Sequence, residues 1–206
     1  MITKKKASRP VGTTGKARAI TDAELKIVLA VAEKTRNSKR NVALLVVSHY
    51  LGLRAKEMAA LKISDVFDGK ELCKTLRLIA IYTKGNVHRD ISLENRKVVA
   101  ALEDYIIYRQ GCDHLGIKLD APLFRSEQWV HFSPNAMSRL FIDLYASAGI
   151  YHASSHTGRR SLITKLSESG VDLYSISKIA GHSDISTTAG YISDNPARLR
   201  NILVNV

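Results

Sequence analysis

Two pairs of side chains in this sequence have the types and spacing that binding a phosphate group requires. Arg54 is the only arginine in the sequence that is followed by an acid, Glu57, three residues later. This spacing puts both side chains on one face of a helix. His156 and Arg159 form the only His-x-x-Arg. Two guanidinium groups, always charged and forked to match phosphate oxygens, suit the negative charge of a phosphoryl-transfer transition state. Arg54 and Arg159 are therefore the candidate clamp, with Glu57 holding Arg54 by an ion pair.

Three further residues would complete such a site. Tyr191 follows His182, which stands in a Gly-His-Ser tripeptide, by nine residues. A phenol has a pKa of about 10, so a nucleophilic Tyr191 needs a proton acceptor, and His156 or an assisting water is the candidate. His182 is a candidate third donor to the phosphate, and Lys84 stands in a Thr-Lys-Gly tripeptide. Each feature alone has an ordinary explanation as a surface ion pair, a core histidine or a turn lysine, and the signal is their joint occurrence in this order.

Local patterns predict mostly helices around these residues. A capping box formed by Thr21 and Glu24 opens the first helix, and Ser133 before a proline opens another. We expect helices over 21–34, 38–50, 54–61, 95–110 (closed by Gly111), 133–148, 157–169 and 172–180, a helix carrying Tyr191, and a last one over 196–206. Strands are expected over 75–82 and 87–93, which would place Lys84 at a hairpin tip. The predicted fold class is mainly α with a small antiparallel β-sheet (α+β).

The charge of the chain favours an anionic partner. Thirty-one Lys and Arg against nineteen Asp and Glu give a net charge of +12. Residues 1–20 contain no acid and six basic residues, Lys4, Lys5, Lys6, Arg9, Lys16 and Arg18. We expect a flexible arm that contacts phosphates, the alternative being a solubilising tail. Charge alone does not separate DNA from RNA or a membrane, but no apolar run approaches the ~20 residues of a membrane span, and no apolar segment follows the basic N-terminus. We expect a cytoplasmic protein.

The sequence predicts neither a disulfide framework nor a metal site. Cys73 and Cys112 lack a C-x-x-C spacing and are expected to be small buried or half-buried thiols. His152 and His156 stand four residues apart, a spacing that two metal ligands on a helix could have, but no third ligand is evident. We therefore expect no cofactor.

Several segments resemble the signature boxes of the tyrosine recombinase, or phage integrase, family. They are LGLRAKEMAALKISDV, TKGNVHRDISL, SSHTGRRSLITKL and SGVDLYSISKIAGHSDISTTAGYI, and the intervening APLFRSEQ and SPNAMSRLF are similar to that family as well. The resemblance covers about residues 21–195 and implies the catalytic-domain fold of the family there. It also implies a catalytic set of Arg54, Lys84, His156, Arg159, His182 and Tyr191, with Glu57 supporting Arg54.

The resemblance implies a site-specific recombinase acting on double-stranded DNA, in integration, excision or inversion. Tyr191 would attack the phosphodiester and form a 3′-phosphotyrosyl link, and Lys84 would protonate the leaving 5′-oxygen. Because the ester keeps the bond energy, rejoining would need neither ATP nor a metal. Two alternatives remain open. A non-catalytic DNA-binding accessory protein would share the fold, and a relaxing enzyme like the type IB topoisomerases would share the chemistry.

The sequence departs from the family pattern in two places. Gly158 stands where many relatives have leucine, and we expect it to weaken the start of its helix. A short basic arm precedes the catalytic domain, where relatives usually carry a further helical domain, so the arm and Arg160 are the candidate DNA contacts. The helix over 196–206 either packs on its own core or docks into a neighbouring subunit. Docking would link four protomers on two DNA sites, with a monomer or dimer when free.

Overall fold

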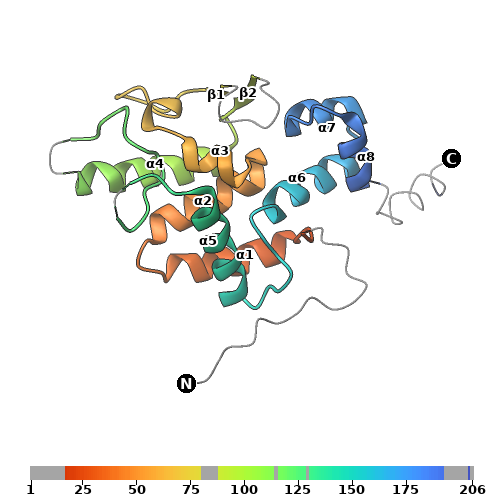
Figure 1. The fold of residues 1–206 in the computed structure, drawn as a ribbon, viewed down its shortest axis with the longest axis horizontal. Coiled ribbons are helices and arrows are strands. Elements are labelled where there is room, and N and C mark those ends of the chain that lie inside the picture. Colours follow the sequence, from red (N-terminus) through yellow and green to blue (C-terminus); the bar gives the residue numbers. More distant parts are fainter. Residues whose placement is uncertain (1–16, 80–87, 114–115, 129, 193–203, 205–206) are drawn as a thin grey trace.

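The computed structural model describes residues 17–79, 88–113, 116–128, 130–192 and Val204, and the described chain is mainly helical (Figure 1). Its elements are α1 (Asp22–Glu33), α2 (Ser38–Leu51), α3 (Ala55–Ala60), a 3-10 helix (Ile63–Asp65), β1 (Thr75–Leu78), β2 (Arg89–Ser92), α4 (Arg96–Cys112), α5 (Pro134–Ser147), α6 (Thr157–Glu168), α7 (Leu173–Ala180) and α8 (Ile185–Ile192). β1 and β2 form one antiparallel ladder, in which Thr75 faces Ser92 and Leu78 faces Arg89. The predicted fold class is confirmed.

The helix ends follow from local chemistry. Thr21 caps α1 through its side chain, and Glu24 reaches back to the Thr21 backbone, which is the predicted capping box. Ser133 caps α5 ahead of a proline in the first turn, also as predicted. Gly52 ends α2 in the left-handed region at φ 64°, a conformation that glycine adopts at no steric cost.

Helix α2 lies at the centre of the molecule and packs against α1, α4 and α6. Ten of its fourteen residues are buried, which explains its largely apolar sequence. One large apolar core joins residues from Ile20 to Ile150, while Ile163, Ile176 and Ala180 form a small separate cluster between α6 and α7. In Figure 1, α6, α7 and α8 lie on the side opposite α4, with the β-hairpin along one edge. The predicted site residues come from both regions, since Arg54 precedes α3 beside the large core and Arg159 lies on α6.

Two expectations about elements were wrong. Helix α4 does not end at Gly111 but runs to Cys112. The Asp113 backbone N–H donates to the Arg109 carbonyl at 3.0 Å, and the Asp113 carboxylate pairs with Arg109 and Arg125, so the last turn is held despite the glycine. The segment 18–20, expected to belong to a flexible arm, is docked on the fold, and Ile20 is buried. The helix expected over 196–206 lies, apart from Val204, outside the described residues.

Cys73 and Cys112 are free, half-buried thiols, as predicted. None of the described helices has the length and apolar character needed to span a membrane.

We expected Gly158 to weaken the start of its helix, but the structure shows that it also allows α6 to pack closely against α2. It lies in the first turn of α6, where a Cβ atom would stand 2.5 Å from Ser48 Oγ and 2.8 Å from the Ser48 carbonyl carbon. Ser48 belongs to α2. Only a residue without a Cβ lets α6 approach the backbone of α2 this closely.

Gly158→Ala is therefore expected to destabilise the protein by about 1–3 kcal/mol, the usual cost of overpacking. Gly111→Ala is the matched control, since Gly111 is also helical but nothing beyond its own helical turn lies within 4 Å of the place where a Cβ would stand. That change should stabilise the protein by about 0.5–1 kcal/mol, because alanine loses less backbone entropy on folding. Urea unfolding measures both. A Gly158→Ala variant as stable as the wild type would show that α2 and α6 can separate at no cost.

Candidate active site

Arg54 and Glu57 meet at the start of α3. Arg54 is the residue before the first helical residue, with extended backbone at φ −77° and ψ 152°. Its backbone N–H donates to Glu57 Oε2 at 2.8 Å, and its Nη1 donates to Glu57 Oε1 at 2.7 Å. The expected ion pair is present, but the reason differs from the one predicted. The carboxylate turns back to the N-cap residue, and the two side chains do not lie along one face of a helix.

Arg89, at the start of β2, is a residue of the site that the sequence analysis missed. Glu57 is fully buried, with 0% of its side chain exposed, and Arg89 is 9% exposed. Arg89 donates Nη1 to Glu57 Oε1 at 3.1 Å and Nη2 to Glu57 Oε2 at 2.9 Å. One buried carboxylate therefore holds two guanidinium groups. The available signal was the position of Arg89 in the segment TKGNVHRDISL, five residues after Lys84, but nothing in its spacing points to Glu57.

Two glycine carbonyls brace the two candidate clamp arginines. Arg159 Nη1 donates to the Gly52 carbonyl at 2.9 Å, and Arg54 Nη2 donates to the Gly181 carbonyl at 3.0 Å. Both glycines end a helix in the left-handed region at φ 64°. Arg159, only 2% exposed, thus ties α6 to the end of α2, while Arg54 ties the start of α3 to the end of α7. One of these hydrogen bonds is donated from the α6–α8 region to the large-core region, and the other is donated in the opposite direction.

His182 lies within the electrostatic field of these arginines. Its Nδ1 stands 2.7 Å from the hydroxyl of buried Thr188. Burial, followed by the positive charges of Arg159, Arg54 and Arg89, lowers the pKa of His182 to about 4, so the imidazole is neutral at pH 7. When the Thr188 hydroxyl donates to Nδ1, the imidazole proton resides on Nε2, which is then a donor.

His156 stands at the start of α6 as its N-cap residue, three positions before Arg159. Its backbone N–H donates to Ser154 Oγ at 3.2 Å, and the residue as a whole is exposed. Partial loss of solvent around the ring, followed by the charges of Arg159 and Arg54, lowers the pKa of His156. The same two guanidinium groups therefore act on both imidazoles. This agrees with the geometry, since Arg54 contacts the carbonyl of Gly181, the residue before His182, and Arg159 lies in the first turn of the helix that His156 caps.

Two members of the predicted set cannot be placed in full. Tyr191 lies in the last turn of α8, but its side chain falls outside the described residues. Lys84 lies between β1 and β2, in the stretch 80–87, which is also outside them. Their contributions therefore remain predictions.

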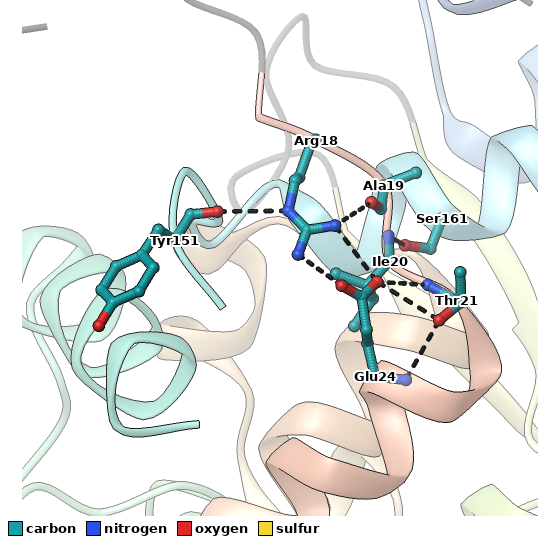
Figure 2. Close-up of polar contacts among 7 residues, drawn as sticks. All are labelled: Arg18, Ala19, Ile20, Thr21, Glu24, Tyr151 and Ser161. Carbon is teal, nitrogen blue, oxygen red and sulfur yellow. Dashed lines mark hydrogen bonds and ion pairs between the residues drawn. The ribbon is translucent and has the colours of Figure 1, made fainter. Parts of the chain in front are cut away.

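The basic residues expected to contact DNA fall into two groups. Lys4, Lys5, Lys6, Arg9 and Lys16 lie outside the described residues. Arg18 is described and is engaged by the fold, as Figure 2 shows. Its Nη2 and Nη1 donate to Glu24 at 2.6 and 3.2 Å, and its Nε donates to the Tyr151 carbonyl at 3.2 Å. Next to it, the Ile20 N–H donates to Ser161 Oγ on α6 at 2.9 Å. Arg18 thus fastens the start of the described chain, a role different from the expected phosphate contact. Arg160 is half-buried on α6.

Arg18→Ala is accordingly expected to leave the salt dependence of DNA binding unchanged and to lower the free energy of unfolding by at most about 1 kcal/mol. Each phosphate contact adds about 0.9 to the slope of log Kobs against log salt concentration. A variant with Lys4, Lys5 and Lys6 changed to alanine is the comparison, and its slope should fall. A fall of about 0.9 for Arg18→Ala would restore Arg18 as a phosphate contact.

His152, considered beside His156 as a metal ligand, is exposed and has a left-handed backbone at φ 61°. Within the described part of the chain, no three His, Cys, Asp or Glu side chains are grouped so as to hold a metal ion.

The comparisons with known proteins agree with the sequence boxes. The model of the phage integrase family matches residues 18–198. The chain is 32% identical over 190 residues to tyrosine recombinase XerC of Rhizobium meliloti (strain 1021), covering 90% of this chain and 56% of that protein. It is 31% identical over 194 residues to tyrosine recombinase XerC of Rickettsia bellii (strain OSU 85-389), covering 91% of this chain and 59% of the relative. The chain thus spans between half and two thirds of the length of these relatives.

Solved structures show the same fold. The crystal structure of XerA recombinase superposes with a TM-score of 0.74 at 26% identity, covering 98% of this chain and 66% of that one. XerH site-specific recombinase, bound to its palindromic difH substrate in a post-cleavage complex, gives a TM-score of 0.70 at 22% identity, covering 91% of this chain and 52% of that one. The latter likeness bears on the fold alone. Together, the matched family model, the sequence relatives and the shared fold show that this chain belongs to the phage integrase family and has the fold of a tyrosine recombinase catalytic domain.

Proposed function

We propose that this chain cleaves and rejoins DNA strands through a 3′-phosphotyrosyl intermediate at Tyr191, as a site-specific recombinase. The observation that carries the proposal is the electropositive region formed by Arg54 and Arg159, with the neutral His182 beside it. Arg54 contacts the end of α7 and Arg159 lies on α6, and both of these helices pack against α8. A phosphodiester under attack gains negative charge on its non-bridging oxygens, and fixed donors that need no rearrangement stabilise that charge most effectively.

The arginine geometry suits this role. Among the described residues, Arg54 uses two side-chain N–H groups, one toward Glu57 and one toward Gly181, of the five that a guanidinium carries. Its side chain is 20% exposed, so further donors remain for a phosphate. Arg159 is oriented by the Gly52 carbonyl, and His182, neutral at pH 7, would donate a hydrogen bond from Nε2 to the same group.

The remaining steps involve His156, which the structure describes, and Tyr191 and Lys84, whose roles are predictions from the sequence. Tyr191 would attack phosphorus, and its phenolic proton would pass to His156 or to a water, because a neutral imidazole can accept it. Lys84 would give a proton to the 5′-oxygen as the bond breaks. The electrons of that bond stay with the leaving oxygen, and the reverse sequence reseals the strand, so no energy source is required.

The partner in this proposal is double-stranded DNA within the cell. The whole reaction would involve four protomers on two DNA sites, with residues 196–206 joining neighbours. A monomer or dimer would be the free form.

The deciding experiment traps the covalent intermediate. Duplexes that bind are first selected by the protein itself from a random pool, and they are then made with a nick beside each candidate cleavage point, so that the short strand is lost after attack. We expect a covalent protein–DNA adduct that resists denaturation and whose DNA maps to Tyr191 by mass spectrometry. Binding with no adduct on any selected duplex would favour the accessory DNA-binding protein. Relaxation of supercoiled plasmids that lack a selected site would favour the topoisomerase-like enzyme.

A further inference from the structure

The buried carboxylate of Glu57 pairs with two arginines, although one ion pair would be enough to hold Arg54. Arg54 donates to it through the backbone N–H and Nη1, and Arg89 adds a two-pronged contact through both Nη atoms. We propose that Arg89 is a positioning residue. It keeps the net charge around Arg54 and Glu57 positive, and it fixes β2 against the start of α3. This inference rests on the proposed function, because it names what makes the clamp effective.

The charge balance explains why one arginine is not enough. Arg54 and Glu57 taken alone form a neutral ion pair, and a neutral pair attracts a phosphate oxygen much less than a free guanidinium does. Arg89 brings the total of the three groups to one positive charge. Glu57 is fully buried and Arg89 nearly so, so solvent and salt screen these charges weakly. Arg89 therefore lets Glu57 hold Arg54 in place without cancelling its charge.

The packing around Arg89 shows that it acts through other residues. It lies beneath the turn that ends α7, where a Cβ atom on Gly181 would overlap the Arg89 guanidinium. The Gly181 carbonyl in turn accepts from Arg54 Nη2 at 3.0 Å. Burial lowers the pKa of Arg89, and the Glu57 carboxylate beside it opposes this shift. The charge also reaches His182, whose pKa it helps to lower.

Arg89 also joins the hairpin to the clamp. It is the first residue of β2 and faces Leu78 of β1 across the ladder. Its two bonds to Glu57 fix the start of β2 against α3. Lys84 lies five residues earlier in the chain.

The test separates Arg89 from a purely structural ion pair. Arg89→Gln removes the charge, Arg89→Lys keeps the charge but loses the two-pronged fork, and Arg77→Gln is the matched control. Arg77 lies in the same hairpin and pairs with Asp90 across the ladder at 3.0 Å, but it is 73% exposed. On a selected nicked duplex under single-turnover conditions, Arg89→Gln should form the adduct roughly 100-fold more slowly, with DNA affinity within about threefold of wild type. Arg89→Lys should lose less, and Arg77→Gln should lose nothing.

A second readout does not require activity. The pKa of His182, followed by NMR, should rise slightly in Arg89→Gln, because burial and the charges of Arg159 and Arg54 lower it more than Arg89 does. It should stay near the wild-type value in Arg89→Lys and Arg77→Gln. If the wild type forms no adduct, the proposed function fails while the His182 titration still decides the electrostatic link. Wild-type cleavage by Arg89→Gln, or an unchanged His182 pKa, overturns the inference. Should Arg89→Gln not fold, Arg89→Lys decides alone, since adduct formation at the wild-type rate would show that the fork is dispensable.

Discussion

Tyr191→Phe is expected to form no covalent adduct with DNA while binding the same duplex with unchanged affinity. The substitution removes the hydroxyl, which is the only atom that can attack phosphorus in the proposed reaction, and it keeps the aromatic ring that α8 carries. Denaturing electrophoresis of a labelled nicked duplex measures the adduct, and a binding assay run in parallel measures affinity.

The matched control for this change is Tyr174→Phe. Tyr174 lies on α7 and is 62% exposed, so it presents a phenol to solvent. It should form the adduct at the wild-type rate. An adduct that persists in Tyr191→Phe would mean that a different side chain is the nucleophile and would remove the chemical basis of the proposed function.

Glu57→Gln is expected to give the largest loss of stability among single changes at the site. The carboxylate is fully buried between Arg54 and Arg89, and the amide would leave two guanidinium charges without a counter-charge. Breaking a buried ion pair in this way typically costs about 3–5 kcal/mol. Urea unfolding measures the loss, and adduct formation should fall as well, because Arg54 loses the group that orients it.

Asp90→Asn provides the comparison, because it also removes a carboxylate that pairs with an arginine of the same hairpin. Asp90 and Arg77 are both exposed, and pairs of this kind contribute little in water. We expect no measurable change in stability or cleavage. Equal effects of the two substitutions would contradict the view that burial makes Glu57 important.

The three-residue spacings in the sequence were informative, although the geometry behind one of them was misjudged. Arg54 and Glu57, like His156 and Arg159, occupy the N-cap residue of a helix and the third residue inside it. This arrangement gathers side chains at the beginning of a helix, where the chain turns. The spacing therefore predicted proximity correctly for Arg54 and Glu57, since a carboxylate at that position can reach back to the N-cap backbone.

The sequence by itself determined the fold class and most helix ends, because capping, helical periodicity and turn chemistry act over a few neighbouring residues. The candidate site residues came from their types and spacing and from the resemblance of the boxes to a known family. Only the tertiary structure decided that Arg89 shares Glu57 with Arg54 across a separation of 32 residues, that glycine carbonyls brace Arg54 and Arg159, and that Arg18 is held by the fold. These contacts depend on how closely packed helices approach one another. Gly158 illustrates the reason, since its missing Cβ has meaning only once Ser48 of α2 lies against it.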